Sequence, residues 1–487
     1  MSALGNRTAI LTLSRLANYG LMLISPVFLV RLLTVADFGR YREFLLYASL
    51  LQAFAQFSIN DSLLYCVPAN PASPWRVVRQ TAVLTFCSSS LVVLVLAILD
   101  TATSGAIVHG YLVPLVAYIL VSVNLDFWEH LWIANGRALW VLLYSAGRLS
   151  IRVVVAVVTA ALTRDFHTVI WALVVMEGAR FAAAGIGLLM FDRSRREPRL
   201  REPWRDQMRY CLPSGSATLL MSLNRNLSNV LVARMLGPVA LAQYAIGRFG
   251  EPIVSTFRNS VSATILPEMV RKDRGGAGSG SALELWQKAT VINAILLFPV
   301  IALVVRYAEP LVTLLFGTNY VAAALIMKIY MAVVVRECFD FAPALRAVNR
   351  ARCIVESIVA GLVTGIIAIL LLVPVSGLTG AMLAVVISSY VDGVWMAWRM
   401  LSAYHVGVRQ LLPWRSLAKT ALAAAMAAVL LVSSVWTDVF GRAGIVIAGL
   451  VYLAAFAVLL QLMRIPEAMV VQAWGKRLVL RHTQARS

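Results

Sequence analysis

Long apolar stretches dominate this sequence of 487 residues. Each is about twenty residues long, the length that a helix needs to cross about 30 Å of hydrocarbon. The chain is 60% hydrophobic and 14% charged, whereas a soluble domain is about half apolar and a quarter charged. The first stretch, 8–30, is too long for the core of a signal peptide and has no small-x-small cleavage site, so we expect it to be retained. The pattern predicts an all-α polytopic membrane protein.

The apolar stretches predict about 14 transmembrane helices. The expected spans cover residues 8–30, 44–66, 79–99, 110–133, 142–162, 168–191, 210–233, 244–268, 285–306, 321–342, 353–373, 380–401, 416–436 and 444–463. The loops between them are short, so no folded soluble domain is expected between two spans.

The distribution of basic residues predicts the orientation of the chain. If the N-terminus is cytoplasmic, 28 of the 43 Lys and Arg residues fall in cytoplasmic segments and seven fall in segments on the opposite side. Basic residues resist translocation and gather on the cytoplasmic side. We therefore expect both termini to be cytoplasmic. The same rule accounts for the net charge of +20, so no nucleic-acid partner is inferred.

A short internal repeat divides the predicted spans into two sets. The segment that follows the first span reads RLLTVADFGRY (31–41), and the segment that follows the seventh span reads RMLGPVALAQY (234–244). Both fit R-[LM]-L-x7-Y at an offset of 203 residues. Six spans per half give both halves the same orientation, which is the parallel-repeat architecture of several transporter folds. We expect six-helix lobes at 1–200 and 201–405, followed by a helix pair and basic tail at 406–487.

These two strings, together with LLFGTNY (314–320), resemble a known family. With the fourteen-span layout, the chain resembles the polysaccharide transporter family, which contains the O-antigen and exopolysaccharide flippases. That family is a branch of the multidrug/oligosaccharidyl-lipid/polysaccharide exporter (MOP) superfamily. Many of its members carry an acidic residue in the seventh span, where this chain has Asn224, Asn226 and Asn229.

The resemblance implies a fold, a location and a substrate. It implies two six-helix lobes around a central cavity lined by spans 1, 2, 7 and 8, in the inner membrane of a bacterium. The implied substrate is an oligosaccharide linked to undecaprenyl diphosphate, moved from the cytoplasmic to the periplasmic leaflet. The expected partners are this lipid-linked oligosaccharide, membrane lipids and polysaccharide assembly proteins.

Polar residues form a stripe on each of spans 1, 2, 7 and 8. Ionisable residues inside a span are costly and usually face a cavity or a partner. Arginine binds phosphate through bidentate hydrogen bonds, and Asn and Gln suit sugar hydroxyls because they both donate and accept. The expected substrate contacts are Arg15, Asn18, Gln52, Gln56, Asn60, Arg225, Asn229, Arg248 and Arg258. Asp61 and Glu251 are the candidates for coupling to a cation or proton.

Several of these charges have an alternative interpretation as structural ion pairs. Arg15 and Asp61 are expected at similar depth, as are Arg225 and Glu251, so each arginine could simply be paired. Arg248 and Arg258 exceed the local supply of acids, which favours anion contact. At helical spacing, Glu177 is expected to pair with Arg180, and Arg336 with Asp340. Asp392 has no evident partner in the sequence. Lys328 in the tenth span could be a further substrate contact.

No enzyme signature is found. The five histidines are scattered without metal-ligand spacing, and there is neither a Walker motif nor a D-x-D string. We expect no catalytic residue, metal or cofactor. The alternatives to a flippase are a drug or metabolite antiporter of the same superfamily, a polysaccharide polymerase or ligase, and a non-transporting membrane scaffold. The polymerase would need a large periplasmic loop with clustered Arg and His.

Overall fold

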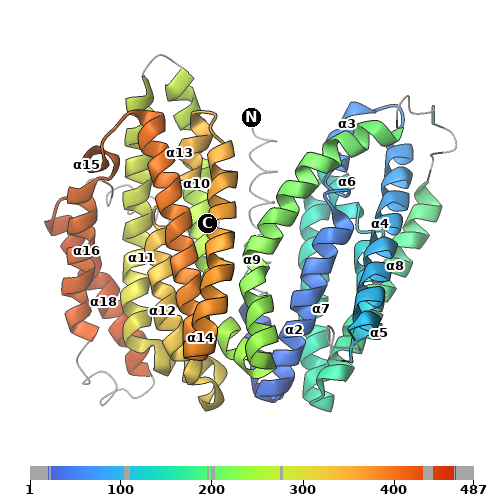
Figure 1. The fold of residues 1–487 in the computed structure, drawn as a ribbon, viewed down its shortest axis with the longest axis horizontal. Coiled ribbons are helices and arrows are strands. Elements are labelled where there is room, and N and C mark those ends of the chain that lie inside the picture. Colours follow the sequence, from blue (N-terminus) through green and yellow to red (C-terminus); the bar gives the residue numbers. More distant parts are fainter. Residues whose placement is uncertain are drawn as a thin grey trace, which may run out of the picture. The chain divides into compact units, whose positions relative to one another are not determined.

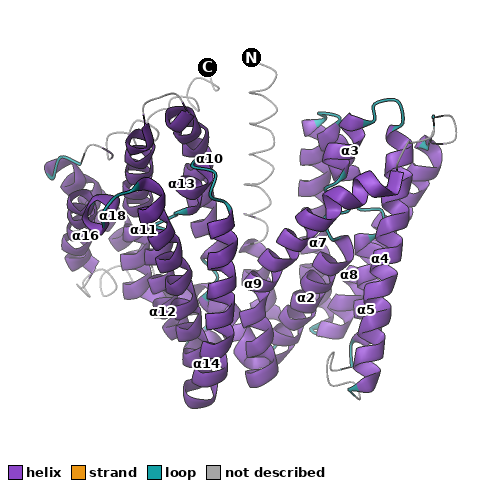
Figure 2. Cartoon of the chain, turned by 45° about the horizontal axis from the view of Figure 1, so that its top comes forward, coloured by secondary structure: helices purple, strands orange, loops and turns teal. Residues whose placement is uncertain are grey.

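The structure, a computed structural model, describes residues 20, 23–103, 110–192, 194, 197–198, 203–274, 278–431, 443–465 and 467. Throughout these ranges the regular elements are helices (Figure 2), and they include no strand. Nine of the helices found there are long and apolar enough to cross a membrane. The chain is therefore a multi-pass, all-α membrane protein, which confirms the fold class predicted from the sequence.

The chain forms two compact units, which we call unit 1 (Met1–Ala242) and unit 2 (Gln243–Ser487). Unit 1 contains the apolar helix Leu23–Leu32, α2 (Val35–Gln56), α3 (Leu63–Ala69), α4 (Pro74–Ala102), α5 (Leu112–Val123), α6 (Trp128–Ala134), α7 (Ala138–Thr163), α8 (Phe166–Phe191) and most of α9 (Pro203–Gly247) (Figure 1). Unit 2 contains α10 (Glu251–Arg274), α11 (Gly278–Phe316), η2 (Thr318–Tyr320), α12 (Ala322–Glu337), α13 (Ala342–Ala347), α14 (Arg352–Tyr404), α15 (Val408–Leu411), α16 (Trp414–Ala428), η3 (Val429–Leu431) and α18 (Ala443–Leu462).

Helix α14 is two membrane spans and not one. Its 53 residues would measure about 80 Å if they were straight, far more than a bilayer core. The chain instead turns back at Gly377, which has a φ of 55°. The Ser388 hydroxyl donates to the Gly361 carbonyl at 2.7 Å, which places the two arms side by side. This hairpin matches the two spans predicted at 353–373 and 380–401, so the number of crossings exceeds the number of long helices. The count of fourteen remains a prediction.

The repeated sequence motif contains a non-helical turn at corresponding positions in both copies, with different backbone angles. In the first copy, helix α2 begins after Thr34, whose side chain accepts a hydrogen bond from the Asp37 amide. At the offset of 203 residues, Thr34 corresponds to Gly237, which breaks α9 with a φ of 79°. The motif was expected to form a loop, but only this turn is non-helical and the rest continues into helix. The second span therefore begins about nine residues earlier than the predicted position 44.

Helix α9 packs along α2 and α3, although the repeat assigns it to the second half of the chain. At one end, the Ser214 hydroxyl donates to the Ser58 hydroxyl at 3.3 Å. At the other end, a Cβ added to Gly39 would lie 2.1 Å from the Pro238 carbonyl oxygen, so the two motif copies touch backbone to backbone. Glycine is the residue that permits such an approach. The start of the second repeat is thus part of unit 1.

A buried polar cluster fastens the first turns of α9 to α3 and α4. The Gln207 amide donates to the hydroxyls of Ser62 and Thr81, each at 2.8 Å. Gln80 in turn donates to the Gln207 side-chain oxygen at 2.8 Å. Just before α9, the Glu197 carboxylate accepts hydrogen bonds from the first backbone amides of α4. Because every one of these buried amide and hydroxyl groups is paired, the cluster positions α9 specifically.

The fourth span of each half is broken at an equivalent place. In unit 1, α5 ends at Val123 and α6 begins at Trp128; in unit 2, α12 ends at Glu337 and α13 begins at Ala342. The sequence predicted continuous spans at 110–133 and 321–342. At each break a side chain from a neighbouring helix donates to a backbone carbonyl, Arg180 to Ser122 in unit 1 and Trp286 to Asp340 in unit 2, as a membrane interior favours.

The terminal helices α16 and α18 pack together beside α11 (Figures 1 and 2). Their interface uses small residues, including Ala423, Ala427 and Ala448, which let helix backbones approach closely. On α11, Arg306 donates to the Leu431 carbonyl at 3.0 Å. The predicted terminal pair is thus a real structural element that belongs to unit 2.

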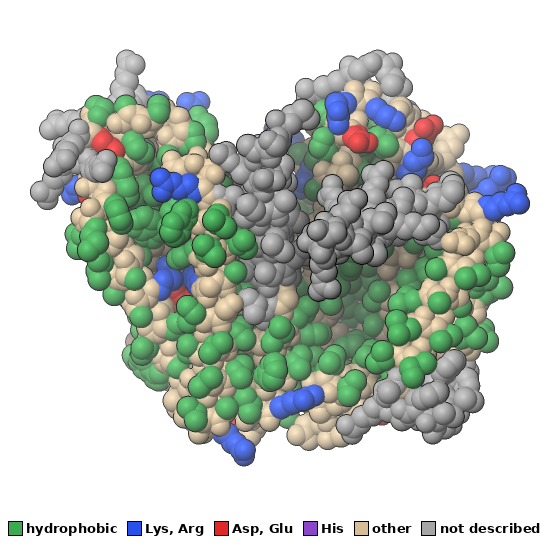
Figure 3. All heavy atoms as spheres, turned by 180° about the vertical axis from the view of Figure 1, so that it is seen from behind, with side chains coloured by type: hydrophobic (Ala, Val, Ile, Leu, Met, Phe, Trp, Pro, Cys, Tyr) green, Lys and Arg blue, Asp and Glu red, His purple; other side chains and the backbone are tan. Residues whose placement is uncertain are grey.

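Outside the spans, the connection between α7 and α8 shows how the helices are capped. The Asp165 carboxylate accepts hydrogen bonds from the Thr168 amide at 2.9 Å and the Thr168 hydroxyl at 2.8 Å. Slight burial favours the neutral carboxyl, but these hydrogen bonds outweigh it and lower the pKa of Asp165. On the face shown in Figure 3, hydrophobic side chains cover much of the surface, and most Lys and Arg side chains lie toward the upper and lower margins of the view.

Candidate functional site: paired charges inside the spans

Ion pairs inside the spans form a cluster in each unit. The unit 1 cluster comprises Asp126, Arg148, Glu177 and Arg180, from the α5–α6 break, α7 and α8. The Arg148 guanidinium lies 2.8 Å from Asp126 and 3.3 Å from Glu177. Arg180 lies 3.1 Å from Asp126 and 2.6 Å from Glu177. The Glu177 side chain is fully buried, so its charge depends on these two arginines.

Arg180 also donates hydrogen bonds to backbone carbonyls at the break in the fourth span. Its second terminal nitrogen donates to the Val121 carbonyl at 2.9 Å and to the Ser122 carbonyl at 2.7 Å. These carbonyls would otherwise lack partners because α5 ends at Val123. The predicted Glu177–Arg180 pair is confirmed. It is part of a larger ion-pair network that also binds the free carbonyls at the end of α5.

The unit 2 cluster consists of three ion pairs that join α10, α12 and α14. Arg248 lies 2.8 Å from Glu251, one turn further along the chain. Arg258 on α10 lies 3.6 Å from Glu337 at the end of α12. Arg336 on α12 pairs with Asp392 on α14. Each of these arginines is at least three-quarters buried, and each has a carboxylate next to it.

Two assignments based on helical spacing are corrected by these contacts. Arg336 was expected to pair with Asp340, and Asp392 was left without a partner; instead, Arg336 and Asp392 pair with each other. A Cβ added to Gly393 would lie 2.8 Å from the Arg336 side chain, so this glycine makes room for the arginine. Asp340 lies in the α12–α13 break, where it accepts a 2.6 Å hydrogen bond from Ser262.

The premise that Arg248 and Arg258 outnumber the local acids is wrong. Glu337 supplies the missing carboxylate, although it comes from a different helix. Its position in the sequence, directly after Arg336 at the end of an apolar stretch, was a signal that could have placed it in the cluster.

Most of the remaining predicted site residues lie in unit 1. Gln52 donates to the Ser122 hydroxyl at 2.7 Å, which ties α2 to α5. Asn60 is 3% exposed, and its amide nitrogen has no hydrogen-bond partner within the described ranges. Gln56 and Asn229 are half-buried, whereas Arg225 is exposed on α9.

Asp61 lies in the turn between α2 and α3, where its carboxylate is 3.1 Å from the His130 ring nitrogen. The Asp61 side chain is 47% exposed, so protons and ions can reach its carboxylate. Sequence reasoning did not foresee the contact with His130. Arg15 and Asn18 lie outside the described residues. Lys328 is exposed on α12.

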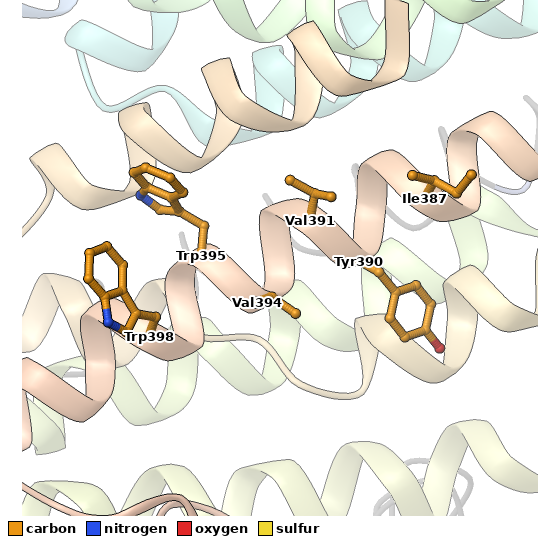
Figure 4. Close-up of a pocket in the computed structure, with 6 residues that line it drawn as sticks. All are labelled: Ile387, Tyr390, Val391, Val394, Trp395 and Trp398. Carbon is orange, nitrogen blue, oxygen red and sulfur yellow. The ribbon is translucent and has the colours of Figure 1, made fainter. Parts of the chain in front are cut away.

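A groove of about 470 Å³ runs along one face of the second arm of α14 (Figure 4). Its lining comes from successive turns of that arm: Ile387, Tyr390, Val391, Val394, Trp395 and Trp398. The Tyr390 hydroxyl donates to the Ala332 carbonyl at 3.1 Å, which leaves hydrocarbon and aromatic surface in the groove. Such a surface suits a hydrocarbon chain better than a sugar.

Comparison with known proteins places these features in a family. Residues 28–325 match the family described as polysaccharide biosynthesis protein. The chain belongs to this family. This agrees with the family resemblance inferred from the sequence motifs. A search of curated proteins finds no match.

The fold of this family member is shared with solved transporter structures. The lipid II flippase MurJ in its inward closed conformation has a TM-score of 0.64 at 11% identity, over 93% of this chain and 98% of that one. An inward-facing MATE multidrug resistance transporter of the MOP superfamily has a TM-score of 0.55 at 15% identity, over 80% of this chain and 96% of that one. An outward-facing MATE multidrug resistance transporter of the MOP superfamily has a TM-score of 0.52 at 14% identity, over 82% of this chain and 97% of that one. The chain therefore has the fold of MOP transporters.

Proposed function

We propose that this protein is a flippase for an oligosaccharide linked to undecaprenyl diphosphate. One combined observation carries the proposal: a polysaccharide biosynthesis protein has the fold of a membrane transporter. MurJ, which is described as a lipid II flippase, shares this fold over 98% of its length. The substrate would move from the cytoplasmic to the periplasmic leaflet as the two halves alternate.

The proposal places the protein in the inner membrane of a bacterium with both termini in the cytoplasm. The basic residues support this orientation, because 28 of the 43 fall on the side assigned to the cytoplasm. Membrane lipids and polysaccharide assembly proteins are the proposed partners besides the substrate. The fold supports a transport role without catalysis.

The proposed substrate contacts remain those predicted from the sequence. For two of them, the structure shows a carboxylate with which the substrate would have to share the arginine. Arg248 and Arg258 each lie beside a carboxylate, so an anion would have to share the guanidinium with it. An arginine can do so because it has five N–H donors, and one carboxylate uses at most a few of them. The buried Nε of Arg258 has no partner in the described part of the chain.

For ion coupling, Asp61 is the better supported of the two candidates. It faces His130, whose unperturbed pKa lies near physiological pH, and it is half-exposed. Glu251 is engaged by Arg248. A proton could therefore be taken up at the Asp61–His130 pair as the halves alternate.

A drug or metabolite antiporter is the second candidate, because the MATE transporters share this fold. The two functions can be separated in vesicles that contain the purified full-length protein. We expect a fluorescent glycan on undecaprenyl diphosphate to become accessible to a membrane-impermeant quencher on the far side. Expulsion of cationic dyes without any movement of the lipid-linked glycan would contradict the flippase and favour the antiporter.

A further inference from the structure

Helix α7 places two arginines one turn apart in the middle of a membrane span. The positive charge of Arg148 is already paired, because its guanidinium binds both Asp126 and Glu177. Arg180 shares the same two carboxylates, so this network has two positive and two negative charges. Arg152 lies one turn beyond it and adds a third positive charge.

Arg152 has no counter-charge of its own. Across the ranges that the structure describes, no carboxylate lies within ion-pair distance of its guanidinium. Residues 1–19, which lie outside those ranges, contain no Asp or Glu. Glu177 is within electrostatic reach, but it is already bound by two other arginines. An arginine remains charged in such a place, and an uncompensated charge in a membrane span is costly.

Besides Arg148 and Glu177, the neighbours of Arg152 include two neutral phenol groups. Its guanidinium carbon lies 5.9 Å from the centre of the Tyr118 ring, a cation–π contact that offsets only part of the cost. Tyr41 is also within electrostatic reach. Both tyrosines are more than nine-tenths buried, while Arg152 itself is partly exposed. The site thus has a partly exposed guanidinium beside two buried phenols, and Arg42 adds a further positive charge within electrostatic reach of Tyr41.

This combination suits a phosphate group. Guanidinium N–H groups and phenol hydroxyls donate hydrogen bonds, and phosphate oxygens accept several of them in a charge-assisted manner. A carboxylate paired with Arg152 would compete with the anion, but in the described ranges the nearby Glu177 is paired with Arg148 and Arg180 instead. In unit 2, by contrast, each of the three arginines of the cluster has a carboxylate next to it.

We propose that Arg152, assisted by Tyr118 and Tyr41, binds the phosphate of the lipid-linked substrate inside unit 1. The assignment of the phosphate to a lipid rests on the flippase function proposed above. It adds to the predicted contacts a residue on the fifth span, where no substrate contact was expected from the sequence.

Binding to the purified full-length protein in lipid nanodiscs tests this site. The probes are undecaprenyl diphosphate, inorganic pyrophosphate and undecaprenol, which lacks phosphate. We expect Arg152→Gln to weaken undecaprenyl diphosphate binding at least tenfold, Arg152→Lys to weaken it less, and Tyr118→Phe to weaken it several-fold. Undecaprenol binding should not change. Arg164→Gln, at the exposed end of α7, is the matched control and should bind like the unchanged protein.

The outcomes separate the site from the function. Equal binding of undecaprenyl diphosphate by the unchanged protein and by folded Arg152→Gln would overturn the site and leave the flippase function standing. If Arg152→Gln does not fold, full affinity in both Arg152→Lys and Tyr118→Phe would overturn it instead. Arg152-dependent binding of pyrophosphate alone would support an anion site but refute a lipid-linked ligand. Failure of the unchanged protein to bind either phosphate probe would overturn the site.

Discussion

Arg258 is paired with Glu337, so the arginine could stabilise the fold, bind the substrate, or do both. Substitutions of these two residues can distinguish the roles. The two side chains connect α10 to α12, and they are 24% and 15% exposed. Removing one member of a buried pair leaves the other charge uncompensated, which costs about 3–5 kcal/mol. A purely structural pair needs only complementary charges, whereas a substrate contact needs a positive charge at one particular position.

A charge exchange separates these roles. We expect Arg258→Glu and Glu337→Arg each to lower the melting temperature of the purified protein, and the double exchange to recover most of that loss because opposite charges again face each other. If Arg258 contacts the substrate, the double exchange should still fail to flip the lipid-linked glycan. Full transport activity in the stable double exchange would remove Arg258 from the substrate site.

The sequence predicts side-chain partners well only when they lie on one helix. Glu177 and Arg180 are three residues apart, so helical geometry alone pairs them. The partners of Arg258 and Arg336 lie on other helices, 79 and 56 residues away in the sequence. Whether two side chains on different helices pair depends on how each helix is rotated about its axis and on the depth of each residue in the membrane. The hydropathy pattern of a single sequence determines neither the rotation nor the exact depth. Arg15 and Asn18 remain predictions.

At the scale of elements, the broken fourth spans are the feature that both halves share. Unit 1 satisfies its break through Arg180, while unit 2 uses a different residue type: the Trp286 indole nitrogen donates to the Asp340 carbonyl at 2.6 Å. Hydropathy cannot detect such breaks because the residues around them are still apolar. The polar positions Asn124, Asp126 and Asp340 within or beside the apolar stretches were the available signal.

Arg180→Gln tests how much the first break depends on its cap. The change removes two ion pairs and frees two carbonyls in a membrane interior. We expect a loss of about 3–5 kcal/mol in unfolding free energy, measured by denaturant titration in detergent micelles. Arg399→Gln is the matched control, because it breaks an ion pair whose Glu356 side chain is 42% exposed and should cost at most about 1 kcal/mol. Equal losses in the two variants would contradict the capping role.

At the scale of the whole molecule, the sequence repeat and the packing divide the chain at different places. The repeat begins its second copy with the seventh span, but α9 is bound to α2, α3 and α4 by the Gln207 cluster and by the Gly39–Pro238 contact. The position of the motif turn could be predicted, because the sequence offset reveals it, whereas the number of spans per half remains a prediction. The attachment of α9 could not, because it depends on buried hydrogen bonds between distant segments.

If α9 belongs to unit 1 throughout the transport cycle, a covalent link between them should be harmless. Ser58→Cys with Ser214→Cys is suited to this test, since the two hydroxyl oxygens are 3.3 Å apart. We expect the disulfide to form under mild oxidation and flipping to continue at a similar rate. A block that a reducing agent reverses would show that α9 must leave α2 during transport. Each single cysteine variant under oxidation is the control.

The position of α9 also bears on where the chain could be divided into two separately expressed parts. A cut where the repeat begins would separate α9 from α3 and α4, to which the Gln207 cluster ties it. It would also separate Gly39 of the first motif copy from Pro238 of the second. Separate expression of the two parts therefore requires a cut between α9 and α10, and not between α8 and α9.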